Sequence, residues 1–307
     1  MMRTGFKSRV TCLVMAAVMA GSLGLTGCGS KSAKAGSGSK TAAADSGSDD
    51  KVLKVGIECT YAPYNWTQES PTVANGDKAV KIANNDGYAY GYDVKVAQMI
   101  AKKLGWKLEI YKSDWSAIFM GLNSKTYDCI MSGICYTKKR DKTLDFTTPY
   151  YCRTIKAIVR SDSKYAEFTK LSQFDGQNPK VTTQAGTNYI DYKKEIPSGV
   201  SVTDYESSPE CFMAIQNKTA DVCILDKTTA QSALATMSGL KVLDLDKSDD
   251  FVAPKDSPND CCIAFREGDK RRDEVNKAMK ELGWTTDNKG KFDKLMDEMV
   301  KLQPSSN

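Results

Sequence analysis

The chain has 307 residues and a formal net charge of +5, with 43 Lys and Arg against 38 Asp and Glu, and it contains no histidine. Three of the basic residues lie within the first 27, so the remainder carries a net charge of only +2, which argues against a nucleic acid or an acidic polymer as partner. Without histidine the chain cannot perform Ser-His-Asp or Cys-His catalysis, and we expect neither a metal site nor a cofactor.

The N-terminus has the organisation of an export signal. An apolar run over residues 10–25 follows three basic residues, and it is too short and too rich in glycine to span a membrane comfortably. The run ends in Leu25-Thr26-Gly27-Cys28, which resembles the lipobox of bacterial lipoproteins. We therefore expect a signal peptide over residues 1–27 and lipidation of Cys28; the alternative is a chance cysteine after an ordinary signal peptide.

The segment after Cys28 has the composition of a tether. Residues 29–50 are mainly Gly, Ser, Ala and Lys, and such a segment cannot bury enough apolar surface to offset its ordering entropy. We expect residues 28–50 to form a lipidated cysteine and flexible tether. The folded part would then lie close to the extracytoplasmic face of a cell membrane, since no later stretch is long and apolar enough to span one.

Strand-like and helix-like segments alternate after the tether. Residues 53–57 form an apolar strand-like run, residues 93–104 carry apolar side chains at helical spacing and are followed by Gly105, and residues 108–111 form the next strand. Between them, residues 67–88 are rich in Asn, Asp and Gly, which predicts a surface hairpin.

A pattern of helix, turn and buried strand occurs twice. The first copy covers residues 115–132 with the turn Lys125-Thr126-Tyr127-Asp128, and the second covers residues 209–225 with the turn Lys218-Thr219-Ala220-Asp221. Polar residues follow each strand, and ligands of open α/β sheets bind beyond the carboxyl ends of the strands. Two lobes that face each other with such ends would form a cleft.

Eight cysteines lie beyond Cys12 and Cys28, and none of them forms a C-x-x-C pair. Most occur in or beside apolar strand-like runs, where a free cysteine behaves as a small hydrophobe. We expect mainly buried thiols. One or two disulfides are left open, because pairing cannot be deduced from sequence.

An ordered series of motifs resembles the polar-amino-acid binding proteins of ABC importers, which have the type II periplasmic binding fold. The motifs that carry the resemblance are Val55-Gly56-Ile57-Glu58, Gly91-Tyr92-Asp93-Val94, the blocks at 133–140 and 145–151, and Gln184-Ala185-Gly186-Thr187.

The resemblance implies an α/β fold with two lobes, each a mixed sheet flanked by helices, joined by two hinge strands. Lobe one would comprise residues 51–153 plus 261–307 and lobe two residues 154–260. The chain would cross between the lobes near residues 154–158 and 260–264.

The resemblance also implies a site for a zwitterion. Arg140 matches the arginine that grips the α-carboxylate, which a guanidinium suits because it donates two parallel hydrogen bonds; the alternative is a surface arginine. The turn Gly186-Thr187-Asn188 precedes a predicted helix and would offer backbone N–H groups to the same carboxylate; the alternative is an ordinary helix N-cap. Asp226 matches the acid that pairs with the α-ammonium, and the alternative is a helix N-cap.

Further contacts would come from the end of the first repeated strand. Ser132, Gly133 and Cys135 are expected to contribute backbone contacts. The family usually has Thr or Ser at the position of Cys135, so a hydroxyl contact is not expected there.

Tyr61 and Trp115 match positions whose rings sandwich the ligand side chain, and Glu58 lies at its far end. This set suits a cationic side chain through cation–π and charge pairing, although glutamine binders of the family also have an acid at the Glu58 position. Trp66 either closes the pocket or fills the core. Asp93 is expected to cap its helix.

These features predict a binding protein, not an enzyme: a monomer that captures a small amino acid, polar and of basic character if Glu58 reads the side chain, by hinge closure and delivers it to a membrane permease. One alternative is a periplasmic dehydratase of aromatic amino acid synthesis on the same scaffold, with Glu58 as general acid. A second alternative is a receptor subunit that senses the ligand. A metal or redox role for the cysteines lacks paired spacing.

Overall fold

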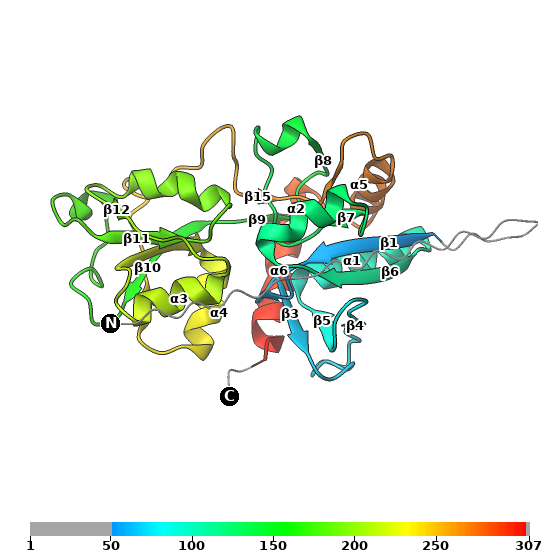
Figure 1. Cartoon of the computed structure of the whole chain (residues 1–307), viewed down its shortest axis with the longest axis horizontal. Coiled ribbons are helices and arrows are strands. Elements are labelled where there is room, and N and C mark those ends of the chain that lie inside the picture. Colours follow the sequence, from blue (N-terminus) through cyan, green and yellow to red (C-terminus); the bar gives the residue numbers. More distant parts are fainter. Residues whose placement is uncertain (1–50, 305–307) are drawn as a thin grey trace, which may run out of the picture. The chain divides into compact units, whose positions relative to one another are not determined.

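The computed structural model describes residues 51–304, so the predicted signal peptide, Cys28 and the tether lie outside the described residues. The described chain contains two five-stranded mixed sheets, a four-stranded sheet and a two-stranded pair (Figure 1). No helix of residues 51–304 has the length and apolar character that a membrane span requires.

The first sheet is mixed. The strand β1 is parallel to both of its neighbours β6 and β7, whereas β16 is antiparallel to β7 and β8. In spatial order the strands are β6 (Lys107–Lys112), β1 (Val52–Ile57), β7 (Cys129–Ile130), β16 (Ala264–Arg266) and β8 (Leu144–Phe146).

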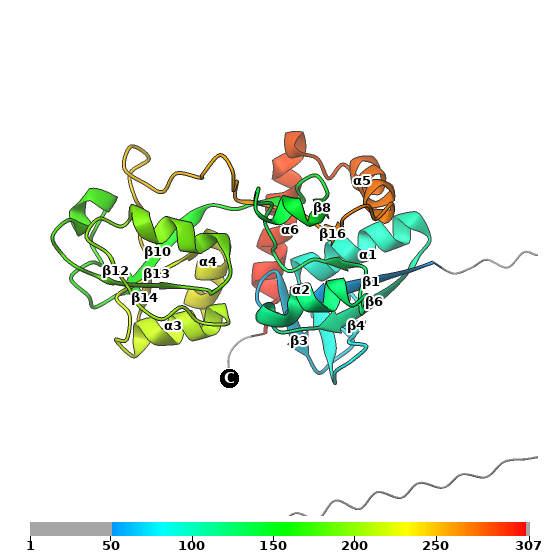
Figure 2. The same ribbon diagram turned by 45° about the horizontal axis from the view of Figure 1, so that its top comes forward.

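Helices cover both faces of the first sheet. Side chains alternate along β7, so Cys129 and Met131 join one apolar cluster and Ile130 joins another. The first cluster includes side chains of α1, α5 and α6, and α1 lies beside α5 (Figure 2); the second includes those of α2. The helices are α1 (Tyr92–Leu104), α2 (Trp115–Asn123), α5 (Arg271–Glu281) and α6 (Lys289–Leu302), with 3-10 turns η1 (Arg140–Lys142) and η4 (Thr286–Asn288).

The helix α1 begins and ends where its sequence predicts. Its apolar positions Val94, Ala97, Ile100 and Ala101 are buried on one face. Gly105 takes the left-handed conformation, with φ 69°, and its N–H bonds to carbonyls of the last turn. The helix therefore ends at Leu104 and presents its apolar face to the sheet.

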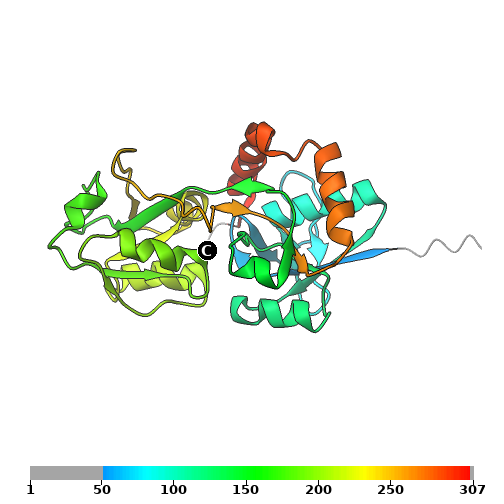
Figure 3. The same cartoon turned by 90° about the horizontal axis from the view of Figure 1, so that it is seen from above.

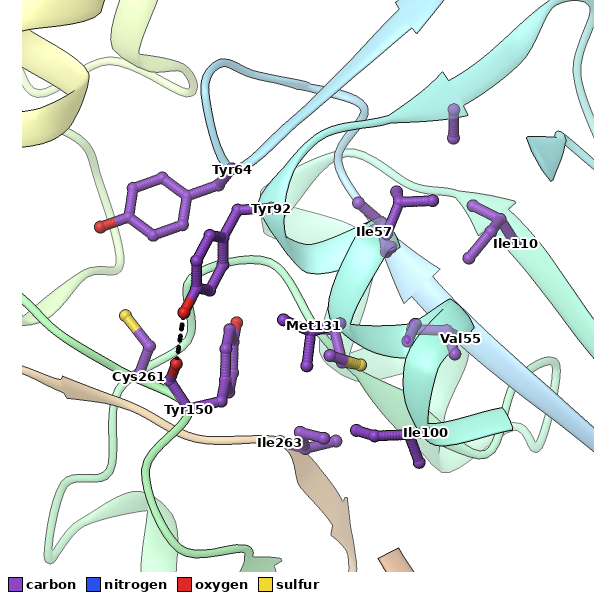
Figure 4. Packing of buried hydrophobic residues seen from close by; sticks show 14 of the residues in the cluster. Val55, Ile57, Tyr64, Tyr92, Ile100, Ile110, Met131, Tyr150, Cys261 and Ile263 are labelled. Carbon is purple, nitrogen blue, oxygen red and sulfur yellow. Dashed lines mark hydrogen bonds between the residues drawn. The ribbon is translucent and has the colours of Figure 1, made fainter. Parts of the chain in front are cut away.

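Tyrosines fill part of the lobe-one core. The Tyr92 hydroxyl donates to the Tyr150 carbonyl at 2.7 Å, and both side chains pack near Met131, Ile263 and Tyr64 (Figure 4). A buried phenol costs free energy unless its hydroxyl finds a partner, and this hydrogen bond supplies one.

The second sheet is also mixed: β13 is parallel to β11 and antiparallel to β10. One cluster of apolar side chains joins it to its helices. The strands in spatial order are β12 (Val200–Ser201), β11 (Lys180–Thr183), β13 (Val222–Asp226), β10 (Ile155–Arg160) and β14 (Leu240–Val242); the helices are α3 (Ser208–Gln216), α4 (Lys227–Thr236), and the 3-10 segments η2 (Leu171–Phe174) and η3 (Asn188–Glu195).

The predicted repeat is present in both sheets. The helix α2 leads through a turn to β7, and α3 leads through a turn to β13. Lys125 and Lys218, which open the two turns, both have φ 63°. The aspartate that ends each turn accepts a backbone hydrogen bond from the strand beside it. Asp128 accepts the Lys54 N–H at 3.0 Å, and Asp221 accepts the Lys180 N–H at 2.9 Å. The two copies are therefore equivalent in structure as well as in sequence.

Two short strands join the lobes. The strand β9 (Tyr151–Cys152) pairs antiparallel with β15 (Asp260–Cys261), and the two lie side by side (Figure 3). The crossing expected at residues 154–158 lies largely within β10, which begins at Ile155 and belongs to the second sheet. The paired hinge strand comes just before it.

Residues 67–88 do more than form a surface hairpin. They take part in a four-stranded antiparallel sheet with the order β2 (Thr60–Tyr61), β3 (Asn65–Gln68), β5 (Tyr88–Tyr90) and β4 (Val80–Lys81). Val73 and Ile82 from this segment are buried in the lobe-one core. Because these two apolar residues stand isolated among polar ones, there is no periodic pattern from which their burial could be predicted.

Candidate functional site

Most of the predicted site residues line one small cavity of about 10 Å³, which has room for roughly one water molecule. The cavity adjoins a larger one of about 530 Å³. Of the predicted residues, only Trp66, Gly186 and Asp226 do not line the smaller cavity, and three lining residues were not predicted: Arg153, Gln184 and Tyr189. The full lining is Glu58, Tyr61, Trp115, Ser132, Gly133, Cys135, Arg140, Arg153, Gln184, Thr187, Asn188 and Tyr189.

Arg140 reaches from lobe one to lobe two. It opens the 3-10 turn η1, and its Nη1 donates to the Cys135 carbonyl at 2.9 Å while its Nη2 donates to the Gly186 carbonyl at 3.1 Å. The guanidinium lies 5.6 Å from the ring centroid of Trp115. Burial lowers the pKa of Arg140 to about 10, so it is a cation at neutral pH. Both walls of the cavity are thus linked by one charged side chain.

Asp226 is a helix N-cap that also receives phenols. It ends β13, and its carboxylate accepts the backbone N–H groups of Thr228 and Thr229 at 3.1 and 3.0 Å, which caps α4. The same carboxylate accepts the hydroxyls of Tyr61 at 2.7 Å and Tyr189 at 3.1 Å. Asp226 is fully buried, and these two tyrosines lie between its carboxylate and the cavity.

Glu58 follows β1 and is held from both lobes. It accepts the Ser132 hydroxyl at 3.2 Å and the Gln184 side-chain amide, also at 3.2 Å. Burial raises the pKa of Glu58 to about 8. At neutral pH the carboxyl is therefore mainly protonated and uncharged.

Tyr61 and Trp115 border the cavity from different elements. Tyr61 stacks on Tyr64, with ring centroids 4.7 Å apart. Trp115 begins α2 and packs edge to face against Phe119 at 5.7 Å. Both rings are available to the cavity, but each has an aromatic partner from its own lobe.

Trp66 takes the second of its two expected places, whereas Asp93 takes a place that was not expected. Trp66 lies in the four-stranded sheet against Tyr90, with centroids 5.5 Å apart, and is part of the lobe-one core. Asp93 does not cap α1, whose N-cap is Gly91; its buried carboxylate accepts the Tyr150 hydroxyl at 2.6 Å and the Asn65 amide. The helix start was predicted, but the tertiary partners of Asp93 were not.

The turn at residues 186–188 leads into a 3-10 helix, η3, where a helix was expected. The Thr187 hydroxyl accepts the Tyr189 N–H at 3.3 Å and donates to the Gln184 carbonyl at 2.7 Å. Gly186 has φ 69°, a conformation that glycine adopts without strain. The turn is therefore capped locally, and it lies across the cavity from Trp115 and Arg140.

Gly133 and Cys135 follow the first repeated strand as predicted. A Cβ on Gly133 would lie 2.7 Å from the Tyr61 ring, so the glycine allows that close approach. Burial opposes ionisation of Cys135, but a hydrogen bond from Cys261 and the charges of Arg153 and Arg140 outweigh it, and the pKa of Cys135 is lowered. The eight cysteines of the described chain are free thiols.

Arg153 is the charged residue among the three lining residues that sequence reasoning missed. It lies between β9 and β10, lines the cavity, and donates to Asn188 and Tyr189 of lobe two. The available signal was two basic residues, Arg153 and Lys156, within the largely apolar run from Tyr150 to Val159.

The comparisons with known proteins agree with this architecture. The family model of bacterial extracellular solute-binding proteins, family 3, matches residues 72–300. The L-cystine-binding protein TcyJ of Escherichia coli K12 is 29% identical over 178 residues, which is 58% of this chain and 60% of that protein. The arginine-binding extracellular protein ArtP of Bacillus subtilis is 25% identical over 249 residues, 80% of this chain and 84% of that protein.

Solved structures show the same fold. The substrate-binding protein of an amino acid ABC transporter is 25% identical with a TM-score of 0.63, and the alignment covers 81% of this chain and 99% of that one. A substrate-binding protein from Streptococcus pneumoniae bound to L-arginine is 23% identical with a TM-score of 0.65, covering 82% and 95%. The fold is that of the two-lobed type II periplasmic binding proteins, and the chain belongs to the family 3 bacterial extracellular solute-binding proteins.

Proposed function

We propose that this protein captures an amino acid between its two lobes and delivers it to the membrane permease of an ABC importer. The observation that carries the proposal is the small cavity that polar side chains of both lobes line, with the predicted Arg140 and Glu58 among them. The names of the relatives support it, since TcyJ is named for cystine, ArtP for arginine, and the solved structures for amino acid transport.

Opposite charges on the two lobes match the two ends of a zwitterion. Arg140 of lobe one would exchange its bond to the Gly186 carbonyl for the α-carboxylate, with help from the N–H groups of residues 186–188. Asp226 of lobe two would accept the α-ammonium in place of the phenols of Tyr61 and Tyr189. A ligand held by both lobes stabilises the closed form that a permease recognises.

Binding requires the lobes to separate. A cavity with room for roughly one water molecule cannot admit an amino acid. The hydrogen bonds from Arg140 to Gly186 and from Tyr61 to Asp226 must therefore break before a ligand can enter. These contacts join the two lobes directly, and β9 with β15 is the segment about which they can turn. We therefore assign capture to hinge closure.

Several finer features extend the proposal. We assign the exported protein a lipid anchor at Cys28, an extracytoplasmic location at the cell membrane, and a monomeric state. The lipobox and the tether composition support the anchor, and the family description of extracellular binding proteins supports export.

Calorimetry on ligand-free protein tests the proposal, after a thermal-shift screen with the common amino acids, ornithine and cystine. Arg140→Ala and Asp226→Asn should each weaken binding by about 10- to 100-fold, the effect of losing a hydrogen bond between charged groups. Asp226→Asn keeps the N-cap of α4, and Lys139→Ala removes an exposed neighbouring charge as control. Wild-type affinity in both site variants would show that these two residues do not hold the ligand.

A dehydratase on the same scaffold is a second candidate, because the raised pKa of Glu58 leaves a protonated carboxyl at the cavity, as a general acid requires. One of the similar solved structures is an ancestral amino acid-binding protein described as a precursor of cyclohexadienyl dehydratase. We expect no turnover of prephenate or arogenate by the purified protein, and product formation that Glu58→Gln abolishes would establish the enzyme instead.

A further inference from the structure

Arg153 is a buried cation at the junction of the lobes. It follows the hinge strand β9, only 8% of it is exposed, and its guanidinium faces the cavity lined also by Arg140 and Glu58. A buried guanidinium is expensive unless an anion compensates its charge. The identity of its partners therefore decides what the residue is for.

The partners of Arg153 are mostly neutral. Its Nη2 donates to the Asn188 amide oxygen at 3.1 Å and to the Cys135 sulfur, and its Nη1 donates to the Tyr189 hydroxyl and, at 3.5 Å, to the Tyr61 hydroxyl. Its Nε has no hydrogen-bond partner. The cation also lies 4.8 Å from the Tyr189 ring centroid. Cys135, a weak acceptor, is the one partner whose pKa is lowered, whereas burial raises the pKa of the two tyrosines.

No carboxylate of residues 51–304 forms an ion pair with Arg153. The acid linked to it most directly is Asp226, and the link runs through the hydroxyls of Tyr61 and Tyr189. Neutral groups can satisfy the N–H donors of a guanidinium, but they do not compensate its charge. The charge of the Arg153 guanidinium is therefore not paired directly with a carboxylate of the described residues.

The charges around the cavity are unbalanced toward positive. Arg140 and Arg153 each contribute a cation, Asp226 behind the tyrosines contributes one anion, and Glu58 is mainly protonated at neutral pH. Burial raises the pKa of Asp93, which interacts electrostatically with Arg153, to about 7, so that this carboxyl is only partly ionised. A simple zwitterion brings no net charge and leaves part of the positive charge uncompensated. A ligand with one more carboxylate removes that excess.

We propose that Arg153 binds a second carboxylate of the ligand, so that the protein prefers amino acids that carry two carboxylates over those that carry one. The inference rests on the proposed function and names the substrate class of the same site. It replaces the basic preference that Glu58 alone suggested. The second carboxylate can come from a dicarboxylic amino acid, such as glutamate, or from a dimeric amino acid, such as cystine.

The position of Arg153 suits this role in the closing motion. Its contacts to Asn188 and Tyr189 cross to lobe two, whereas its contacts to Cys135 and Tyr61 stay with lobe one. When the lobes open, Arg153 loses its contacts to Asn188 and Tyr189. Part of its guanidinium is then free to donate two parallel hydrogen bonds to a carboxylate. A ligand carboxylate offers the charge that these neutral side chains lack.

Calorimetry with matched ligands tests the inference. Glutamate and glutamine differ in little besides the second carboxylate, and cystine is paired with S-methylcysteine. We expect wild-type protein to bind glutamate or cystine at least ~10-fold more tightly than its partner ligand, the lower range for one charge-assisted hydrogen bond, and the pair that shows the gap identifies the source of the carboxylate. Arg153→Gln should abolish the gap, and Arg153→Lys should keep part of it.

Two controls separate a specific role from a structural one. Arg160→Gln removes an arginine that pairs with Asp162 away from the cavity, and it should keep the preference. Melting temperatures and circular dichroism establish that each variant is folded.

The outcomes are distinct. Equal wild-type affinity for both members of each ligand pair, or an equal loss for both in Arg153→Gln, overturns the role of Arg153 while amino acid binding stands. Binding of no amino acid of any class refutes the proposed function, and this inference with it.

Discussion

The carboxyl of Glu58 should make the stability of the protein fall as the pH rises. Burial raises its pKa from 4.5 to about 8 in the folded state. Between these values the unfolded chain releases the proton while the folded chain retains it, so the folded state binds more protons and loses stability with increasing pH. At 1.36 kcal/mol for each pKa unit, the loss is about 5 kcal/mol over the whole interval. It is absent below pH 4.5 and complete above pH 8.

The substitution Glu58→Gln isolates this effect. Glutamine keeps the shape and can hydrogen-bond to Ser132 and Gln184, but it carries no proton to lose. The variant should match wild type near pH 4.5 and exceed its free energy of unfolding by several kcal/mol at pH 8, measured by urea titration followed by circular dichroism. Glu69→Gln, at an exposed carboxyl, is the control. A difference between Glu58→Gln and wild type that stays constant from pH 4.5 to 8.5 would refute the reasoning.

Three further predictions concern packing, thiol reactivity and proton linkage. Gly56→Ala places a Cβ 2.4 Å from the Tyr127 ring and should lower the free energy of unfolding by about 1–3 kcal/mol, whereas Gly290→Ala, with open space around it, should lower it little or raise it; similar values for both would contradict the packing argument. Cys135 should be alkylated by iodoacetamide ahead of the other described cysteines when the lobes are open, and saturating ligand should slow the reaction, as mass spectrometry of the peptides can show. A cationic ligand that ionises Glu58 should release close to one proton at pH 7 in calorimetry across buffers of different ionisation enthalpy, and glutamate should release none from it.

The sequence predicted those helix ends and turns whose conformation is set by residues adjacent in the chain. The helix α1 ends at Leu104 because Gly105 can adopt the left-handed conformation, which is a property of the chain itself. The repeated turns at Lys125 and Lys218 were visible because the same short polar sequence recurs between a helix and a buried strand. Mixed sheets and two lobes followed from the resemblance to a family.

The details of the site depend on residues far apart in the chain. Trp66 lies in the core because residues 67–88 build a small sheet around it, which no local pattern announces. Asp226 caps a helix, which was one of its two predicted roles, and it also accepts the hydroxyl of Tyr61, a partner far away in the chain. Arg153 was overlooked because nothing local distinguishes it from the nearby Lys156, and its partners come from both lobes.

The pairing of β9 with β15 limits the ways in which the two lobes can part. Strands joined edge to edge by backbone hydrogen bonds flex together as a ribbon, and sliding one past the other would break those bonds. We therefore expect one soft bending coordinate, with shear and independent twisting both stiff. A ligand then needs to favour only the closed end of that bending motion. A single distance measured between the two lobes suffices to follow opening and closing.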